Sequence, residues 1–227
     1  MTLPAMLFAA GFGTRMRPLT DDRPKPLIEV AGRPLIDHAL ALARGARLHP
    51  LVANAHYKAG MLSDHLLPQG VQVSHETPEI LDTGGGLRAA LPMLGEGPVV
   101  TLNTDAIWAG PNPVSLLLEA WDPARMDALL ILVPPGSAVG REGPGDFVMD
   151  ADGRLTRGAG HVYGGIQIVK TEGLAAIPDA AFSLNRLWDA MIPAGRLHGL
   201  VYPGRWCDVG HPGGIALAEE MLKAADV

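Results

Sequence analysis

The chain has 227 residues, 48% of them hydrophobic, which is enough for one large domain with a substantial core. Its net charge of −6 argues against a nucleic-acid-binding surface, and its single cysteine, Cys207, excludes an intrachain disulfide framework. No apolar stretch approaches the roughly 20 residues of a membrane helix, and the amino terminus lacks the basic segment of a signal peptide. We therefore predict a soluble, cytoplasmic protein with one domain over residues 1–227 and no nucleic-acid or membrane partner.

Strand-like and helix-like stretches alternate through the first 133 residues. Continuous apolar runs predict buried strands, and apolar residues at three- or four-residue spacing predict helices. The predicted strands are 6–10, 51–55, 71–74, 99–102 and 128–133, and the predicted helices are 34–44, 58–67, 86–94 and 114–121. This alternation indicates an α/β fold with a mostly parallel, Rossmann-like central sheet flanked by helices.

The pattern changes after residue 133. The segment 134–145 (PPGSAVGREGPG) has the composition of a flexible loop. The elements expected beyond it are short strands at 146–149, 155 and 161–169, a helix at 182–192, a strand at 197–202 and a terminal helix at 213–225. We predict that the short strands form a small antiparallel region over the carboxyl edge of the sheet.

The glycine-rich stretch after the first predicted strand is the main candidate for a ligand site. Gly11 and Gly13 follow the strand, and Arg15, Arg17 and Lys25 come soon after them. Glycine lets the backbone approach a ligand closely, and the N–H groups of such a turn form a concavity for anions. The basic side chains form a local positive island in an acidic chain. The stretch therefore predicts a polyphosphate site at the carboxyl end of the first strand.

Two known phosphate-binding motifs do not fit this stretch. A Rossmann dinucleotide fingerprint needs a glycine or alanine three residues after the second glycine, where this chain has Met16. A Walker P-loop ends in Gly-Lys-Ser/Thr, and no such tripeptide occurs. Through AAGFGTRMRPLT and PKPLIEVAGRPLI, the stretch instead resembles the signature of the sugar-1-phosphate nucleotidylyltransferases.

The resemblance implies an enzyme that joins a nucleoside triphosphate to a sugar 1-phosphate. It implies that Arg15 stabilises the departing pyrophosphate and that Lys25 bridges the two reacting phosphates. The residues that it assigns to the nucleotide are Ala9, Ala10, Gly11, Gly13, Thr14, Gly84, Gly85 and Asn103.

Two aspartates are candidate magnesium ligands. Asp105 closes the apolar run VVTLNTDA, and Asp208 lies in RWCDVGHP. Taken alone, each is more simply a turn or helix-capping aspartate, although Mg²⁺ with a triphosphate takes one or two carboxylates. The family carries aspartates at both positions, so the resemblance implies that Asp105 and Asp208 hold Mg²⁺. Thr104 departs from the family pattern, in which glycine usually precedes the first aspartate, and we expect the carboxylate to stay in place.

Three successive glycines in LDTGGGL, residues 81–87, precede a predicted helix. Taken alone, they equally indicate a flexible helix start. The resemblance implies that this segment lies along the nucleotide base and that Gly84 and Gly85 contact it through backbone groups. Glu76 or Asp82 is a further candidate acceptor for a hydrogen bond from the base.

The sugar is expected beside Gly145, Asp146 and Gly165. An aspartate there accepts hydrogen bonds from hydroxyls, and glycines leave room for a bulky substituent. The simpler alternatives are a turn for Asp146 and a β-bulge for Gly165. The Glu-Lys-Pro segment that supplies a sugar-phosphate lysine in many relatives is absent, and residues 153–160 offer only Arg154 and Arg157.

The short chain, the LDTGGG and GDF segments and the missing Glu-Lys-Pro are most similar to family members that act in cell-wall sugar recycling. Those members transfer UMP from UTP to N-acetylmuramate 1-phosphate. The alternative is a mannose 1-phosphate guanylyltransferase or another hexose 1-phosphate member, because these share the signature. A non-catalytic sugar-nucleotide sensor is a third hypothesis, which the presence of Arg15, Lys25, Asp105 and Asp208 disfavours.

Overall fold

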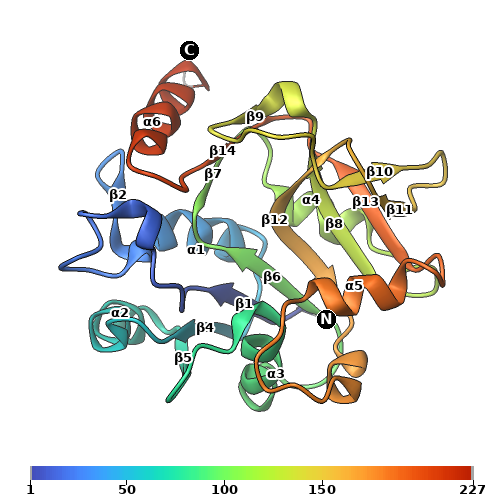
Figure 1. Ribbon diagram of the computed structural model, residues 1–227, viewed down its shortest axis with the longest axis horizontal. Coiled ribbons are helices and arrows are strands. Elements are labelled where there is room, and N and C mark those ends of the chain that lie inside the picture. Colours follow the sequence, from blue (N-terminus) through green and yellow to red (C-terminus); the bar gives the residue numbers. More distant parts are fainter. Residues whose placement is uncertain (1, 226–227) are drawn as a thin grey trace.

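Seven strands form the central sheet of the structure, a computed structural model that describes residues 2–225 (Figure 1). From edge to edge they are β13 (Leu197–Val201), β8 (Ala128–Val133), β12 (Val162–Val169), β6 (Val99–Asn103), β1 (Ala5–Phe8), β4 (Leu51–Ala55) and β5 (Gln72–His75). All neighbouring strands are parallel except β12, which runs antiparallel to β6 and β8. This architecture is the predicted α/β fold with a mostly parallel sheet.

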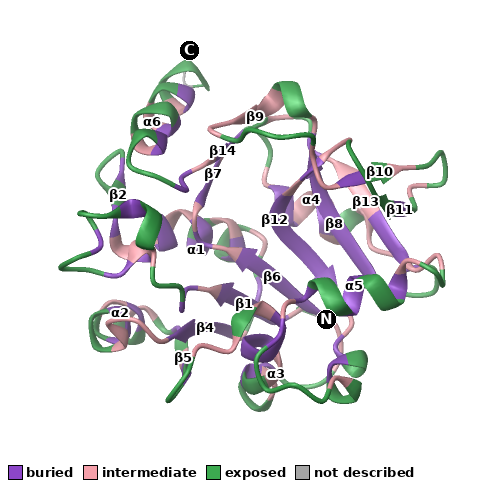
Figure 2. Ribbon diagram, in the orientation of Figure 1, coloured by how far each residue is buried: buried purple, intermediate pink, exposed green. Residues whose placement is uncertain are grey.

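Helices cover both faces of this sheet. On one face lie α1 (Leu35–Gly45), α2 (Ala59–Leu66) and α4 (Pro113–Ala120), and on the other lie α3 (Asp82–Leu94) and α5 (Asn185–Met191). Successive side chains of a strand point to opposite faces, so Ala5 and Leu7 pack with the first group of helices and Met6 with the second. Figure 2 shows the strands buried and the exposed residues on the outer helix surfaces and loops. Within residues 2–225, no helix combines the length and apolar character needed to cross a membrane.

The position of β12 differs from the prediction. The sequence pattern assigns residues 161–169 to a small antiparallel region beside the sheet, whereas β12 lies inside the sheet between β6 and β8. Every residue from Gly164 to Val169 is buried, as expected of a central strand covered on both faces. Of the strands predicted for that region, β10 (Phe147–Met149) and β11 (Leu155–Arg157) form a separate antiparallel pair, and a second such pair is formed by β2 (Glu29–Val30) and β3 (Arg33–Pro34).

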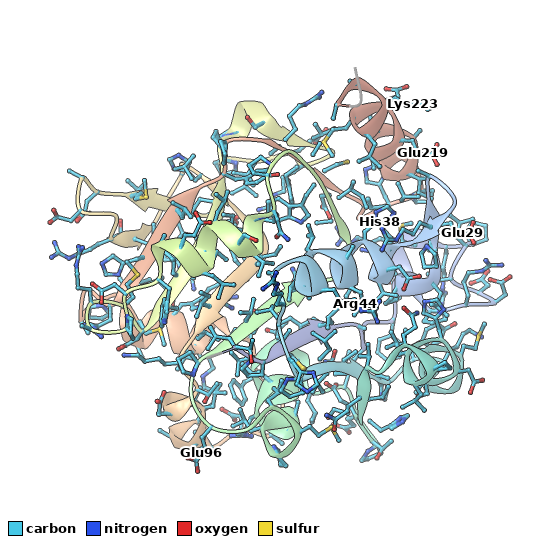
Figure 3. The ribbon with its side chains drawn as sticks, turned by 180° about the vertical axis from the view of Figure 1, so that it is seen from behind. Glu29, His38, Arg44, Glu96, Glu219 and Lys223 are labelled. Carbon is cyan, nitrogen blue, oxygen red and sulfur yellow. The ribbon has the colours of Figure 1, made fainter. Side chains whose placement is uncertain are left out.

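A three-stranded sheet that the sequence pattern does not predict follows β6. Its strands are β7 (Ala106–Ala109), β14 (Arg205–Asp208) and β9 (Ala138–Val139), in the order β7-β14-β9. The terminal helix α6 (Gly213–Ala225) packs its buried residues Ala218 and Met221 against this sheet. Glu219, labelled in Figure 3, accepts a hydrogen bond of 3.0 Å from Ala31 N. These contacts hold α6 beside the carboxyl-terminal end of β14.

The three successive glycines lie inside α3, which begins at Asp82 rather than at residue 86 as predicted. Each of the three glycines permits another part of the chain to approach the α3 backbone closely. An added Cβ would lie 2.4 Å from the Phe182 ring at Gly84, 2.3 Å from Ala180 O at Gly85, and 2.5 Å from Glu76 Oε1 at Gly86. The glycines therefore allow α3 to pack closely against its neighbours. They do not form a flexible helix start.

Replacing Gly84 by alanine should lower the free energy of unfolding by about 2 kcal/mol, because overpacking a tight contact forces its neighbours apart. Gly60 in α2 is a matched control, since no atom lies within 4 Å of an added Cβ there. Gly60→Ala should raise helix stability by about 0.5–1 kcal/mol. Urea unfolding of both variants measures the difference. Equal stability of the two variants would contradict the packing role of Gly84.

Candidate active site

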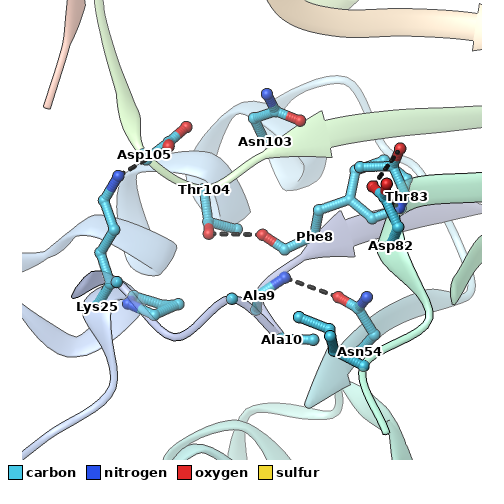
Figure 4. Close-up of a pocket in the computed structure, with 14 residues that line it drawn as sticks. Phe8, Ala9, Ala10, Lys25, Asn54, Asp82, Thr83, Asn103, Thr104 and Asp105 are labelled. Carbon is cyan, nitrogen blue, oxygen red and sulfur yellow. Dashed lines mark hydrogen bonds and ion pairs between the residues drawn. The ribbon is translucent and has the colours of Figure 1, made fainter. Parts of the chain in front are cut away.

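The carboxyl ends of β1, β4 and β6 meet at one edge of the sheet, where they border a pocket of about 250 Å³ (Figure 4). Ligands in open α/β sheets bind at this edge. The wall residues from the predicted set are Ala9, Ala10, Gly11, Gly13, Lys25, Asp82, Asn103 and Asp105. The pocket thus brings together the glycine loop, the predicted catalytic lysine and one predicted metal ligand.

Side chains from the two neighbouring strands fix the end of β1. The Thr104 hydroxyl donates to Phe8 O at 2.8 Å, and the backbone N–H of Ala9 donates to Asn54 Oδ1 at 2.7 Å. Both bonds are drawn in Figure 4. Thr104, which replaces the glycine expected from the family resemblance, thereby adds a bond that glycine cannot make. β1 ends at Phe8, two residues before the predicted strand end at Ala10, so the glycine loop starts at Ala9 and leaves β1 from a fixed backbone position.

Glu76, one of the two candidate acceptors for the base, does not line the pocket. It is 1% exposed, and its two carboxylate oxygens accept hydrogen bonds from Asn54 Nδ2 and Leu81 N, both at 2.7 Å. Since Asn54 in turn holds Ala9, Glu76 supports the glycine loop from behind the pocket. Asp82, the other candidate, is exposed and lines the pocket.

Gly84 and Gly85 also lie elsewhere than predicted. Both are buried, and both backbone N–H groups donate to Phe182 O, at 2.8 and 3.1 Å. Their N–H groups are therefore already used within the protein, and neither glycine lines the pocket. Asp82 and Thr83, just before them, line the pocket instead. Contact of this segment with a nucleotide base stays a prediction, with Asp82 and Thr83 as its pocket-lining residues.

Lys25 connects the glycine loop to Asp105. Gly13 has a φ of 62°, and a Cβ on it would lie 2.8 Å from Lys25 Cβ, so only glycine lets the loop pack on this side chain. The ammonium group of Lys25 lies 2.8 Å from Asp105 Oδ2, and the lysine side chain is 13% exposed. A largely buried, charge-assisted contact of this kind fixes the ammonium group at the pocket wall.

Asp105 immediately precedes β7, and Asp208 is the last residue of β14, the strand that pairs with β7. Asp208 is the register partner of Ala106 in the antiparallel β7–β14 pair, and Val209 N donates to Asp105 O at 2.8 Å. Burial raises the pKa of Asp208 above its usual range, and the negative charge of Asp105 raises it further, against the opposing effect of nearby cations. The two predicted metal ligands are thus close enough to repel each other.

This pair fits a divalent cation. Carboxylate oxygens are suitable ligands for Mg²⁺, and a shared cation would relieve the repulsion between Asp105 and Asp208. In the part of the chain that the structure describes, no group of three or more His, Cys, Asp and Glu side chains forms a metal cluster. Such a two-carboxylate set suits Mg²⁺, which completes its coordination with phosphate oxygens and water.

Arg15 does not line the first pocket. It is exposed on the short 3-10 turn Thr14–Met16 and borders a groove with Asp208. A Cβ on Gly210 would lie 3.0 Å from Asp208 Oδ2 and 3.3 Å from Arg15 Nη1, so the two side chains converge there. Thr14 is exposed and does not line the pocket, in contrast to its predicted contact with the nucleotide.

A second pocket, of about 300 Å³, adjoins the first and shares Phe8, Asp82, Thr83 and Asn103 with it. Asp146, the predicted sugar ligand, lines it. Its Oδ1 accepts from Arg141 Nη2 at 2.8 Å and its Oδ2 accepts from Tyr163 N at 2.9 Å, so its carboxylate is held in place. The two pockets together form one elongated cleft.

The glycines predicted to contact the sugar shape the cleft without lining it. Gly165 is buried at the bulge of β12 with a φ of 90°, and a Cβ on it would lie 2.9 Å from Asn103 Cβ. A Cβ on Gly145 would lie 2.2 Å from Gly160 O. Both glycines therefore permit close approaches that position Asn103 and the loop before Asp146.

Several lining residues were not predicted to belong to the site. Asn54 is the second-to-last residue of the buried strand β4, and Asn103 is the last residue of β6, so a polar residue near a strand end was the available signal. Arg141, Asn185 and Trp188 reach the second pocket from the 134–145 loop and α5. Their sequence contexts carry no motif, and only tertiary packing, of α5 for Asn185 and Trp188 and of the loop for Arg141, brings them to the cleft.

Thr104→Val should lower the free energy of unfolding by about 1–2 kcal/mol, because it leaves the partly buried Phe8 carbonyl without its donor. Thr104→Ser retains the hydroxyl and should stay within about 0.5 kcal/mol of the parent protein. Chemical denaturation measures both variants. A serine variant as unstable as the valine variant would show that the methyl group, and not the hydrogen bond, matters.

Comparisons with known proteins agree with this geometry. The family model described as the MobA-like NTP transferase domain matches residues 5–212. The chain is 43% identical to the N-acetylmuramate alpha-1-phosphate uridylyltransferase of Caulobacter vibrioides, with 97% of each chain covered. It is 32% identical to the protein of the same name from Neisseria meningitidis serogroup B, with 92% of this chain and 93% of that chain covered.

Among solved structures, a Bacillus anthracis protein in complex with sucrose superimposes with a TM-score of 0.81. The match covers 100% of this chain and 96% of that chain, and at 15% identity it supports the fold alone. The predicted fold and the predicted nucleotidyltransferase activity are confirmed. The chain belongs to the MobA-like NTP transferase family.

Proposed function

We propose that this protein transfers UMP from UTP to N-acetylmuramate 1-phosphate, forming UDP-N-acetylmuramate and pyrophosphate in cell-wall sugar recycling. One observation carries the proposal. The glycine loop, Lys25 and the Asp105–Asp208 pair converge at one end of a cleft whose other end has room for a sugar. The names of the two relatives described above support UTP and N-acetylmuramate 1-phosphate as the substrates.

The first pocket is proposed to hold the nucleotide. Gly11 is exposed at the pocket wall, where its backbone is available to phosphate oxygens. Asp82 and Thr83 border the same pocket and are proposed to face the base. The second pocket, with Asp146 at its wall, is proposed to hold the sugar. Asn103 borders both pockets and lies where the two substrates would meet.

The reaction is an in-line displacement at phosphorus. A phosphate oxygen of the sugar 1-phosphate attacks the α-phosphorus of UTP, the bond from that phosphorus to the β-phosphate oxygen breaks, and pyrophosphate leaves with the electron pair. The attacking phosphate is already ionised, so no general base is needed. Such chemistry depends mainly on positioning and on charge stabilisation.

Two cationic side chains are proposed to stabilise this transfer. Lys25 would contact the attacking phosphate and the α-phosphate, because its ammonium group is fixed between the glycine loop and Asp105. Arg15 would receive the leaving pyrophosphate from the groove that it shares with Asp208. Asp105 and Asp208 would hold Mg²⁺, which when bound supplies charge neutralisation and alignment of the phosphates.

The remaining expectations belong to the same proposal. The chain is proposed to act as a single domain, since α6 after Asp208 packs on β7 and β14 and not on a separate core. A cytoplasmic location follows from the proposed use of UTP and is consistent with the single, buried Cys207.

A substrate panel tests the proposed function. UTP, GTP and dTTP are each combined with N-acetylmuramate, mannose and glucose 1-phosphates, and pyrophosphate release is measured with Mg²⁺. We expect the highest kcat/KM for UTP with N-acetylmuramate 1-phosphate. A preference for GTP with mannose 1-phosphate would contradict the proposed uridylyltransferase activity and favour the guanylyltransferase alternative. Sugar-nucleotide binding with no turnover in any combination would favour a sensor.

A further inference from the structure

Arg157 is a preorganised cation at the wall of the second pocket. Its guanidinium stacks over the rings of Phe147 and Trp188, 4.8 and 5.5 Å from their centroids. Its Nε and Nη2 donate to Asp189 Oδ1 at 3.1 and 2.8 Å, and Nη2 also donates to Asn185 Oδ1 at 2.8 Å. Stacking and hydrogen bonding together fix the plane of the group.

This arrangement leaves donors for a ligand. A guanidinium has five N–H groups, and the contacts to Asp189 and Asn185 use those on Nε and Nη2. Within residues 2–225, Nη1 makes no hydrogen bond. The side chain of Arg157 is 39% exposed, so an anion that enters the pocket does not have to displace a buried ion pair.

Arg157 lies at the end of the cleft away from the reacting phosphates. Arg141 borders both the second pocket and the Arg15–Asp208 groove, so it belongs to the phosphate end. Arg157 borders neither that groove nor the nucleotide pocket. It shares its wall with Asn185 and Trp188 of α5. A sugar whose 1-phosphate lies near Lys25 would therefore point its ring substituents toward Arg157.

We propose that Arg157 binds a carboxylate carried on the sugar ring and so makes the site selective for acidic hexosamine 1-phosphates. The inference rests on the proposed function and names the group that the second pocket recognises. N-acetylmuramate has such a carboxylate on its lactyl ether arm, whereas N-acetylglucosamine is the same sugar without the arm. Carboxylate and guanidinium form strong, charge-assisted hydrogen bonds.

The test compares Arg157→Gln with the parent protein on three ligands: N-acetylmuramate 1-phosphate, its carboxyl methyl ester, and N-acetylglucosamine 1-phosphate. Dissociation constants are measured by calorimetry with a non-hydrolysable UTP analogue present, and KM by pyrophosphate release. For N-acetylmuramate 1-phosphate, the variant should raise Kd and KM about 50-fold. Its kcat should change by less than about twofold, because the carboxylate is remote from the reacting atoms.

The other ligands and variants separate the alternatives. Neither the ester nor N-acetylglucosamine 1-phosphate should bind Arg157→Gln more weakly than the parent. Arg157→Lys should recover part of the affinity. Arg154→Gln is the matched control, because Arg154 belongs to the same hairpin segment but pairs with Asp152 outside the cleft, and it should change nothing.

Three results would overturn the inference. Equal weakening for all three ligands would mean that Arg157 binds the shared phosphate, and unchanged affinity would mean that it binds no anion. Equal affinity of the parent protein for N-acetylmuramate 1-phosphate and for its methyl ester would show that the carboxylate is not recognised, and this result requires no variant. If the parent releases no pyrophosphate from UTP and N-acetylmuramate 1-phosphate, the proposed function fails as well. If the parent protein turns over these substrates and Arg157→Gln does so with the same kcat and KM, only the inference about Arg157 fails and the proposed function stands.

Discussion

Lys25→Met should lower kcat for nucleotidyl transfer about 1000-fold, the scale observed when an enzyme loses one preorganised electrostatic donor. Methionine keeps the apolar stem that packs against Gly13 and removes the ammonium group that lies 2.8 Å from Asp105. The loss should fall on kcat, since this charge is proposed to act mainly on the phosphates as they react. Pyrophosphate release at saturating substrates measures it.

Lys223→Met provides the control for this experiment. Lys223, labelled in Figure 3, is exposed on α6 and lines neither pocket of the cleft. Its replacement should leave kcat unchanged. A Lys25→Met protein that keeps more than about a tenth of the parent kcat would contradict the proposed role, on the scale expected for a catalytic charge. Its thermal unfolding curve should be checked, because Asp105 loses its ion-pair partner.

Asp208→Asn should also lower kcat about 1000-fold, through loss of one of two carboxylates proposed to hold Mg²⁺. A second effect separates this role from a structural one. Burial and, after it, repulsion from Asp105 raise the pKa of Asp208 and so disfavour its charged form, and without Mg²⁺ the neutral asparagine should not lower the melting temperature. Mg²⁺ with a UTP analogue should raise the melting temperature of the parent protein and much less that of the variant.

The exposed Asp64 of α2 serves as the control, and Asp64→Asn should behave as the parent does in both measurements. The double variant Asp105→Asn with Asp208→Asn tests whether the two aspartates act as a unit. If they share one cation, the double variant should lose little more activity than either single variant. Multiplied losses, or full stabilisation of Asp208→Asn by Mg²⁺, would contradict a shared site.

Periodicity in the sequence was sufficient for the fold class but not for the sheet topology. Strands such as 51–55 and 128–133 are mostly apolar runs, and the structure reproduces their predicted bounds. Residues 161–169 have the same character, but an apolar run does not tell which neighbours a strand pairs with or in which direction. The position of β12 between β6 and β8 depends on long-range packing that local pattern cannot encode.

The candidate site shows the same division. Residues that follow strands directly, such as Gly11, Asn103 and Asp105, line the cleft as their position predicts, because parallel strands end at one edge. Gly84 and Gly85 do not, since the sequence cannot distinguish a glycine that meets a ligand from one that meets Phe182. Burial of that segment is a tertiary property, visible only once α3 and residues 180–182 are in contact.

A crystal structure with UDP-N-acetylmuramate and Mg²⁺ tests the central claim most directly. The account predicts uridine in the first pocket beside Asp82 and Thr83, the ion bound by both Asp105 and Asp208, and the sugar in the second pocket beside Asp146. Product bound outside this cleft, or an ion that contacts neither aspartate, would contradict it.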